Sequence, residues 1–261
     1  MNRIDRVFLE LREKRRSALM PYLPLGYPTL DQSRLLIRAA EEAGADMLEL
    51  GVPFSDPLAD GPVIQHATQV ALQNGMTLAK CLEMVRDARE AGVKIPLVLM
   101  GYYNPILRFG IDRCVHAAET AGVNGLIVPD LPPEEAGELD LACRACNLDL
   151  VFLAAPTSTP ARLKKIAAAT RGFVYLVSVV GVTGARDEIA PSLPEFVARV
   201  REITNKPVCV GFGISSANSA RRVAQVADGV IVGSALVSKI RSENNAIENA
   251  RSFISELRAA I

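Results

Sequence analysis

Residues 48–62, with the sequence LELGVPFSDPLADGP, place three acidic side chains in a setting that suits proton transfer. Glu49 stands between two leucines in a run typical of a buried strand, and Asp56 and Asp60 follow in a segment spaced by prolines. An unpaired carboxylate is costly to bury. Burial also raises a carboxyl pKa, which suits a group that passes a proton near neutral pH. A strand-end glutamate paired with an arginine is the other interpretation, and position alone leaves both open.

Two connections look longer than the rest, residues 52–77 and residues 179–192. Long loops in compact domains usually act as lids or interaction surfaces. The first holds both aspartates, and its prolines restrict the backbone that presents them. The second contains GVTGAR, whose Gly181 and Gly184 permit hinge motion or a close approach of the backbone to a ligand. An ordinary solvent-exposed loop is the alternative for either segment.

Glycine-rich turns occur at two neighbouring places late in the chain, GFGISS at 211–216 and GSA at 233–235. Each follows an apolar run, and Ser234 opens a short helical stretch, SALVSKI. Glycines let backbone N–H groups converge on an anion, and the amino end of a helix favours negative charge. One such turn is a weak signal, but two in adjacent loops predict a phosphate site.

The cysteines and histidines give little sign of chemistry. Five cysteines, an odd number, do not resemble a disulfide framework. Cys143 and Cys146 have CxxC spacing, but they lie near the end of an expected helix, whereas a redox pair opens one. A structural zinc site needs two further ligands, and His66 and His116 are not at finger-like spacing. We therefore expect no metal site, and both histidines as helix residues without a catalytic part.

Composition points to small-molecule chemistry in the cytoplasm. The 261 residues are 49% apolar, with zero formal net charge and a pI of about 6.8, so no basic surface indicates nucleic acid binding. No apolar run approaches the length of a membrane span. Residues 1–16 mix acidic and basic side chains into an expected amphipathic helix without a signal-like apolar block.

Short β-branched runs alternate with helical stretches along the chain. Strands that alternate with helices imply right-handed βαβ units and a parallel sheet buried on both faces. Eight units in this length predict one (β/α)8 barrel domain over residues 1–261 with an extra N-terminal helix, and a doubly wound open sheet is the alternative. In such barrels the chemistry sits at the carboxyl ends of strands, where Glu49 lies. The expected strands are 18–24, 46–51, 95–102, 125–130, 148–156, 172–178, 206–213 and 228–234; the clearest helices are 32–44, 78–92, 111–122, 160–170 and 193–204.

With these motifs in place, the sequence closely resembles the tryptophan synthase alpha chain family. The resemblance is carried by LELGVPFSDPLADGPVIQ and continues in order through PDLPPEE, YLVSVVGVTGAR, GFGISS and VGSALV. It implies a TIM barrel and a lyase that cleaves indole-3-glycerol phosphate to indole and glyceraldehyde 3-phosphate by a retro-aldol reaction. A free-standing lyase with the same chemistry, and a non-catalytic regulatory barrel, are the alternatives.

The resemblance also implies roles for individual residues. Glu49 matches the family's catalytic acid/base, and Asp60 matches the acid that contacts the indole nitrogen. The expected substrate-binding residues are Tyr22, Met100, Ile127, Leu153, Tyr175, Thr183 and Phe212; those expected to bind phosphate are Gly184, Gly213, Gly233 and Ser234. Ordinary barrel packing is the alternative for each apolar position.

A partner is implied in the same way. The resemblance implies a tryptophan synthase beta chain that receives indole in a complex of two alpha and two beta chains. Pyridoxal phosphate is expected on that partner, and no cofactor is expected in this chain. The interface is expected at an acidic, proline-rich edge formed by Pro53, Phe54, Asp56, Asn104, Pro105, Asp130, Pro132 and Glu135.

Overall fold

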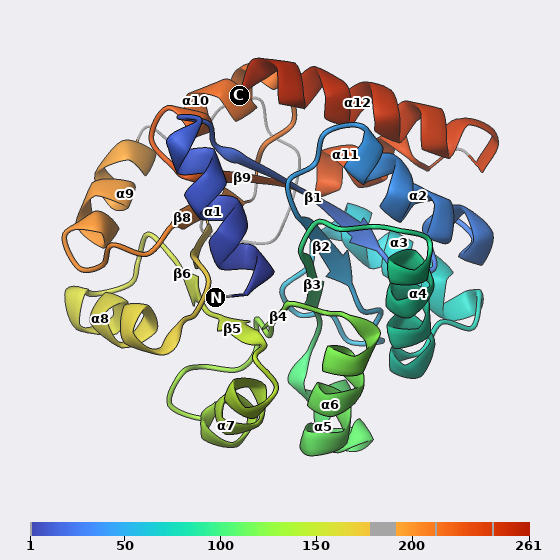
Figure 1. The fold of residues 1–261 in the computed structure, drawn as a ribbon, viewed down its shortest axis with the longest axis horizontal. Helices are drawn as coiled ribbons and strands as arrows, with labels where there is room; N and C mark the ends of the chain where they lie inside the picture. Colours follow the sequence, from blue (N-terminus) through green and yellow to red (C-terminus); the bar gives the residue numbers. More distant parts are fainter. Residues whose placement is uncertain (1, 178–191, 212, 242) are drawn as a thin grey trace.

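The structure is a computed structural model that describes residues 2–177, 192–211, 213–241 and 243–261. In this part of the chain, nine parallel strands form one sheet in the order β5-β4-β3-β2-β1-β9-β8-β7-β6, with the helices arranged around it (Figure 1). The strands are β1 (Ala18–Pro24), β2 (Leu48–Gly51), β3 (Leu97–Met100), β4 (Gly125–Ile127), β5 (Asp149–Val151), β6 (Leu153–Ala154), β7 (Val174–Val177), β8 (Val208–Gly211) and β9 (Gly229–Val232).

The barrel is nearly closed, and the two ends of the sheet, β5 and β6, are consecutive in the chain. β5 pairs with β4 and β6 pairs with β7, and only Phe152 separates β5 from β6. The predicted single strand 148–156 is therefore wrong in detail. Its interruption follows from hydrogen bonding, because the Phe152 N–H donates to the Thr170 hydroxyl at 2.9 Å instead of to a neighbouring strand. Counting β5 and β6 together gives the eight predicted strands, and the (β/α)8 barrel is confirmed.

Helices surround the strands, and the five helical stretches expected from the sequence correspond to α2, α4, α6, α8 and α9, each expected stretch running one to three residues past the end of its helix. Every residue of β1, β2, β3, β8 and β9 is buried, as the apolar character of the runs predicts. The described helices are α1 (Arg3–Glu13), α2 (Leu30–Glu42), α3 (Pro62–Gln73), α4 (Leu78–Glu90), α5 (Tyr103–Phe109), α6 (Ile111–Ala121), α7 (Gly137–Ala145), α8 (Pro160–Ala169), α9 (Leu193–Arg201), α10 (Ala217–Ala224), α11 (Ser234–Lys239) and α12 (Ala246–Ala260), with a short 3-10 turn η1 (Glu243–Asn245) before α12.

Helix α3 corrects the prediction of one long loop over residues 52–77. Pro62 occupies the first turn of α3, where its fixed φ suits a helix and its missing N–H costs nothing. Ile64, Ala67 and Ala71 recur at helical spacing and are buried. The irregular segment after β2 is therefore short, and Asp60 lies two residues before the first residue of α3. The other expected long loop, residues 179–192, lies outside the described residues apart from its last member.

Helix α1 is the predicted extra N-terminal helix, and it covers one end of the barrel (Figure 1). Its Phe8 ring lies 6.0 Å from that of Phe173, which directly precedes β7. The amide of Asn2, which caps α1, donates to the Asp149 carboxylate at the start of β5 at 2.5 Å. These contacts place α1 at the amino ends of the strands and leave the carboxyl ends for a site. None of the described helices is long and apolar enough to span a membrane.

Candidate active site

Glu49 lies on β2, beside Tyr22 of β1 and Val98 of β3 in the strand register, and its side chain is fully buried. Among the described residues no lysine or arginine forms an ion pair with it, so the alternative of a simple ion pair finds no support there. Burial and the nearby Asp60 carboxylate raise the pKa of Glu49 to about 8, against a smaller lowering by the Tyr175 hydroxyl. Among the described residues neither Glu49 oxygen has a hydrogen-bond partner of regular geometry, so the effect of the Tyr175 hydroxyl offsets only part of the cost of burial.

Asp60 is the second buried acid, only 7% exposed. Its backbone is held on both sides, because its N–H donates to the Pro57 carbonyl at 3.2 Å and the Gln65 amide donates to its carbonyl at 2.8 Å. Burial raises the pKa of Asp60 to about 6, against a lowering by the hydrogen bond that the Tyr102 hydroxyl donates to its carboxylate. The segment after β2 therefore presents this carboxylate in a fixed position.

The two acids differ in protonation at neutral pH. With a pKa near 8, Glu49 holds its proton at pH 7, while Asp60, with a pKa near 6, is ionised. A protonated acid beside a carboxylate whose charge raises the pKa of that acid makes a pair with two roles, one to donate a proton and one to stabilise positive charge.

Tyr102 is a site residue that the sequence analysis missed. It follows β3 and is 5% exposed, and its hydroxyl accepts a 2.9 Å hydrogen bond from the Ala59 N–H while donating to Asp60. Its ring lies 5.3 Å from that of Phe54. The available signal was position, since Tyr102 comes two residues after the strand end where barrel enzymes place functional groups.

The expected indole-pocket residues on β3 and β4 lie nearer than Glu49 to the carboxyl ends of the strands. Val98 is the register partner of Glu49, and Met100, two residues further on, points to the same side of the sheet. Ile127 pairs with Met100 and is fully buried. These apolar side chains therefore line the same side of the barrel as the acid, toward its carboxyl end.

Tyr22 on β1 and Tyr175 on β7 are further expected pocket residues, and they form the tyrosine wall of the candidate site. Tyr175 pairs with Leu153, and both tyrosines are buried. Their rings need glycines beside them. A Cβ at Gly51 would lie 2.1 Å from the Tyr22 hydroxyl, and a Cβ at Gly211 would lie 2.4 Å from that of Tyr175. The sequence analysis did not single out these glycines for this purpose.

The expected phosphate residues fall at the ends of two paired strands, β8 and β9. Gly213 has φ +78°, a conformation that favours glycine. Gly233 caps α11 and Ser234 is its first residue, and the Gly233 Cβ position lies 3.6 Å from the Tyr22 Cβ. This turn therefore borders the Tyr22 wall. Thr183, Gly184 and Phe212 lie outside the described residues.

The expected partner edge is assembled from the segments after β2, β3 and β4. The Tyr103 N–H, at the start of α5, donates to the Asp130 carboxylate at 3.0 Å, so this acid caps a helix as well as carrying charge. Asp56 is exposed and accepts a 2.5 Å hydrogen bond from the Ser55 hydroxyl. Of the other expected positions, Asn104 and Glu135 are exposed, Phe54, Pro105 and Pro132 are partly buried, and Pro53 is buried within the chain.

Leu58 adds an apolar side chain that the sequence analysis did not select. It is 83% exposed and lies between Asp56 and Asp60 in the segment after β2. Phe54, the expected apolar anchor, packs instead on Tyr102. Single exposed leucines are common, but one on the segment that holds a catalytic candidate is well placed to contact a partner.

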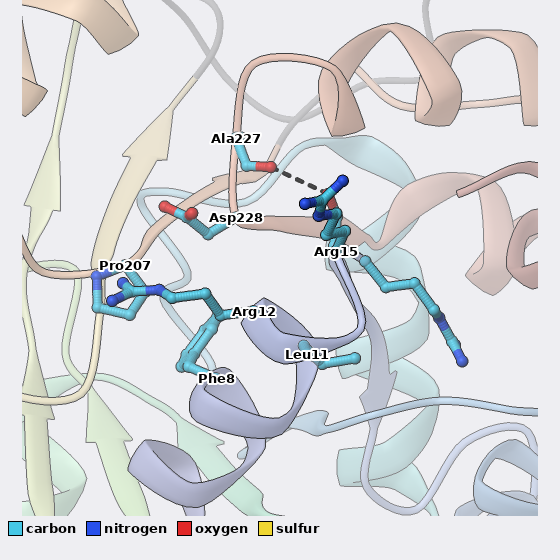
Figure 2. A pocket seen from close by; sticks show the side chains of 9 residues that line it. Phe8, Leu11, Arg12, Arg15, Pro207, Ala227 and Asp228 are labelled. Atoms are coloured by element: carbon cyan, nitrogen blue, oxygen red, sulfur yellow. Dashed lines mark hydrogen bonds between the residues drawn. The ribbon is translucent and has the colours of Figure 1, made fainter.

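A separate hollow lies at the opposite end of the barrel, between α1 and the loops that enter β8 and β9 (Figure 2). Arg12 extends toward Pro207 there, and the Asp228 carboxylate faces the space. Asp228 is already engaged, since it accepts from the Val208 N–H at 2.8 Å and from Arg201 at 3.1 Å. This hollow is remote from Glu49 and Asp60, so it does not belong to the candidate active site.

Comparison with known proteins matches this geometry to one family over nearly the whole chain. A sequence profile of the tryptophan synthase alpha chain matches residues 8–260. The tryptophan synthase alpha chain of Roseiflexus sp. (strain RS-1) is 50% identical over 260 residues, which cover 99% of this chain and 100% of the relative. That of Geobacter sulfurreducens is 49% identical over 264 residues, covering 100% and 99%.

Solved structures agree with the sequence relatives. A structure of Mycobacterium tuberculosis tryptophan synthase superimposes with a TM-score of 0.93 at 43% identity, covering 100% of this chain and 98% of the other. The alpha subunit from Legionella pneumophila superimposes with a TM-score of 0.93 at 37% identity, also covering 100% and 98%. The chain therefore belongs to the tryptophan synthase alpha chain family, whose reaction is the cleavage of indole-3-glycerol phosphate, a lyase reaction.

Proposed function

We propose that Glu49 and Asp60 together carry the retro-aldol cleavage of indole-3-glycerol phosphate in this chain. The observation that supports the assignment is the buried carboxyl pair at the carboxyl end of the barrel, with the pKa of Glu49 near 8 and that of Asp60 near 6. Two acids that titrate on opposite sides of neutral pH match a reaction that needs one proton donor and one anion.

In this mechanism Glu49 moves the protons. Its carboxylic acid gives a proton to indole C3, which makes the ring a cation with the charge on the ring nitrogen. The Glu49 carboxylate then takes the proton of the side-chain hydroxyl. The oxygen forms the aldehyde C=O bond, the bond to C3 breaks, and its electron pair restores the neutral aromatic ring. Indole and glyceraldehyde 3-phosphate result, and Glu49 regains its proton.

Asp60 stabilises the charge that develops during this step. An ionised carboxylate hydrogen-bonded to the ring N–H lowers the energy of the cation more than that of the neutral substrate, which is the condition for catalysis. The apolar side chains of Met100 and Ile127 suit the indole ring and exclude water from the acid. The tyrosine wall, Tyr22 and Tyr175, closes the side of the pocket opposite Met100 and Ile127, and Leu153 lies beside Tyr175.

The remaining assignments follow the family. Gly213, Gly233 and Ser234 are proposed to bind the phosphate through backbone N–H groups and one hydroxyl, together with Gly184; Thr183 and Phe212 are proposed to contact the substrate. The proposed setting is the cytoplasm, in a complex of two alpha and two beta chains that passes indole to the beta chain. Pyridoxal phosphate is assigned to the beta chain and no cofactor to this one.

The test is indole release from indole-3-glycerol phosphate by wild type and by Glu49→Gln, with and without a cognate beta chain. Glutamine keeps the size and polarity of the side chain but exchanges no proton, so turnover should fall by about 10²- to 10⁴-fold. Glu138→Gln, an exposed change on α7, is the matched control and should keep wild-type turnover. Near-normal turnover in Glu49→Gln would remove this residue from the role, and full turnover without a beta chain would favour a free-standing lyase.

A further inference from the structure

The two cysteines of the CxxC sequence lie in different surroundings. Cys143 is within α7 and fully buried, whereas Cys146 caps the carboxyl end of the same helix and is partly exposed. Both are free thiols. The pair therefore does not act as a unit, and Cys146 has its own neighbours on the adjacent helix α6, against which α7 packs.

Those neighbours are a histidine and a glutamate. His116 and Glu119 are three residues apart on α6, so they lie on one face of the helix, with the imidazole Nδ1 3.6 Å from a carboxylate oxygen. The Cys146 thiol hydrogen-bonds to the Glu119 carboxylate. One nitrogen, one oxygen and one sulfur thus lie within 4.8 Å of one another, each from a different side chain.

We propose that Cys146, His116 and Glu119 form a zinc site that joins α6 to α7. Thiolate, imidazole and carboxylate are the three ligand types that Zn²⁺ takes in proteins. Bond lengths of about 2.0–2.3 Å in a tetrahedron separate neighbouring ligand atoms by roughly 3.3–3.8 Å. The histidine–glutamate pair already meets that separation, and the sulfur needs a shift of about 1 Å or slightly more, which ordinary side-chain rotation supplies.

Exposure and charge both suit the ion. The His116 and Glu119 side chains are 76% and 48% exposed, so they are free to adjust and an ion has a path to them. One thiolate and one carboxylate balance the two positive charges, and the solvent-facing fourth position takes a water molecule. Asp112, one turn before His116 on the same helix, adds negative charge near the thiol.

The site has a structural role. Barrel helices run against the direction of the strands, so the carboxyl ends of α6 and α7 lie at the end of the barrel opposite to the acid pair. Zinc there links two neighbouring helices and stabilises the fold, and it leaves the release of indole unchanged.

The whole chain, freed of metal with a chelator, is titrated with zinc chloride by calorimetry. One ion should bind, and the melting temperature should rise with zinc concentration. Cobalt(II) in place of zinc should give the absorption of a thiolate–cobalt bond. Cys146→Ser should abolish that absorption, and both Cys146→Ser and His116→Ala should weaken zinc binding by at least about tenfold, the smallest loss expected even for an outer-sphere partner.

His66→Ala is the matched control, since it removes an exposed helical histidine elsewhere, and it should bind zinc as wild type does. Circular dichroism checks that each surface variant keeps its fold. Unchanged zinc affinity in Cys146→Ser and His116→Ala would place the ion elsewhere and overturn the proposal. Binding weaker than a dissociation constant of about 1 mM would overturn it as well.

Discussion

The Tyr102 hydroxyl accepts a 2.9 Å hydrogen bond from the backbone N–H of Ala59. The same hydroxyl donates to the carboxylate of Asp60, the next residue. One side chain from the end of β3 therefore fixes both the backbone and the functional group of the segment after β2. Because Tyr102 touches neither the scissile bond nor the ring in the proposed mechanism, it is a positioning residue for Asp60.

Tyr102→Phe removes this hydroxyl and keeps the ring against Phe54. A hydrogen bond to a charged group contributes about 1.5–3 kcal/mol, so kcat/KM should fall by about tenfold or more. Loss of the bond also removes the group that lowers the pKa of Asp60. The acidic limb of the pH–rate profile should move to higher pH. A fall in rate without that movement would reduce Tyr102 to a structural role.

The pH dependence of the wild-type reaction follows from the two acids. Below about pH 6 Asp60 takes up a proton and loses its negative charge, and above about pH 8 Glu49 loses the proton that it must donate. The kcat/KM profile of the isolated chain should be bell-shaped between these values, which belong to the coupled pair. Asp60→Asn should remove the acidic limb from the residual activity. A flat profile from pH 5 to 9 would contradict the assignment.

Stability should depend on pH through Glu49 as well. Its pKa is raised in the folded chain from 4.5 to about 8, so its contribution to stability is fully present below about pH 4.5 and is lost as pH rises toward 8. Glutamine cannot ionise. As pH rises across that window, the free energy of unfolding of Glu49→Gln should therefore increase relative to that of wild type by about 1.4 kcal/mol per pH unit.

Urea unfolding at several pH values measures this difference. Glu135→Gln, a change of the same kind at an exposed position, is the control and should follow wild type throughout. Equal pH dependence in Glu49→Gln and wild type would mean that Glu49 does not carry the raised pKa.

Features that depend on neighbouring residues in the chain could be predicted from the sequence, whereas contacts between residues far apart in the chain could not. The strand around Glu49 was readable because its apolar pattern is continuous, and the eight-strand count gave the barrel. The prediction of one long loop over residues 52–77 is wrong because Pro62, which follows Pro53 and Pro57, is the first residue of α3 and not part of a loop. The bond from Tyr102 to Ala59 and the meeting of Cys146 with His116 join residues far apart in the chain. Only the packing of barrel elements brings them together.

The segment after β2 links the expected partner edge to the candidate active site. Leu58 is 83% exposed, two residues after the exposed acid Asp56 and two before Asp60. A beta chain that covers Leu58 would hold this segment, and with it the Asp60 carboxylate, in one arrangement. Partner binding at Leu58 would favour this arrangement and so raise turnover without adding a group to the site.

Leu58→Ala and Asp56→Ala should therefore each weaken the complex with the beta chain, the leucine change by about tenfold or more because it removes an apolar anchor. Both should reduce activation and largely spare the activity of the isolated chain, since neither side chain belongs to the pocket. Leu141→Ala is the matched control, because Leu141 on α7 is also strongly exposed, at 70%. Titration with the beta chain while following indole release measures affinity and activation together. Wild-type values for both in the Leu58 and Asp56 variants would place the partner on another face.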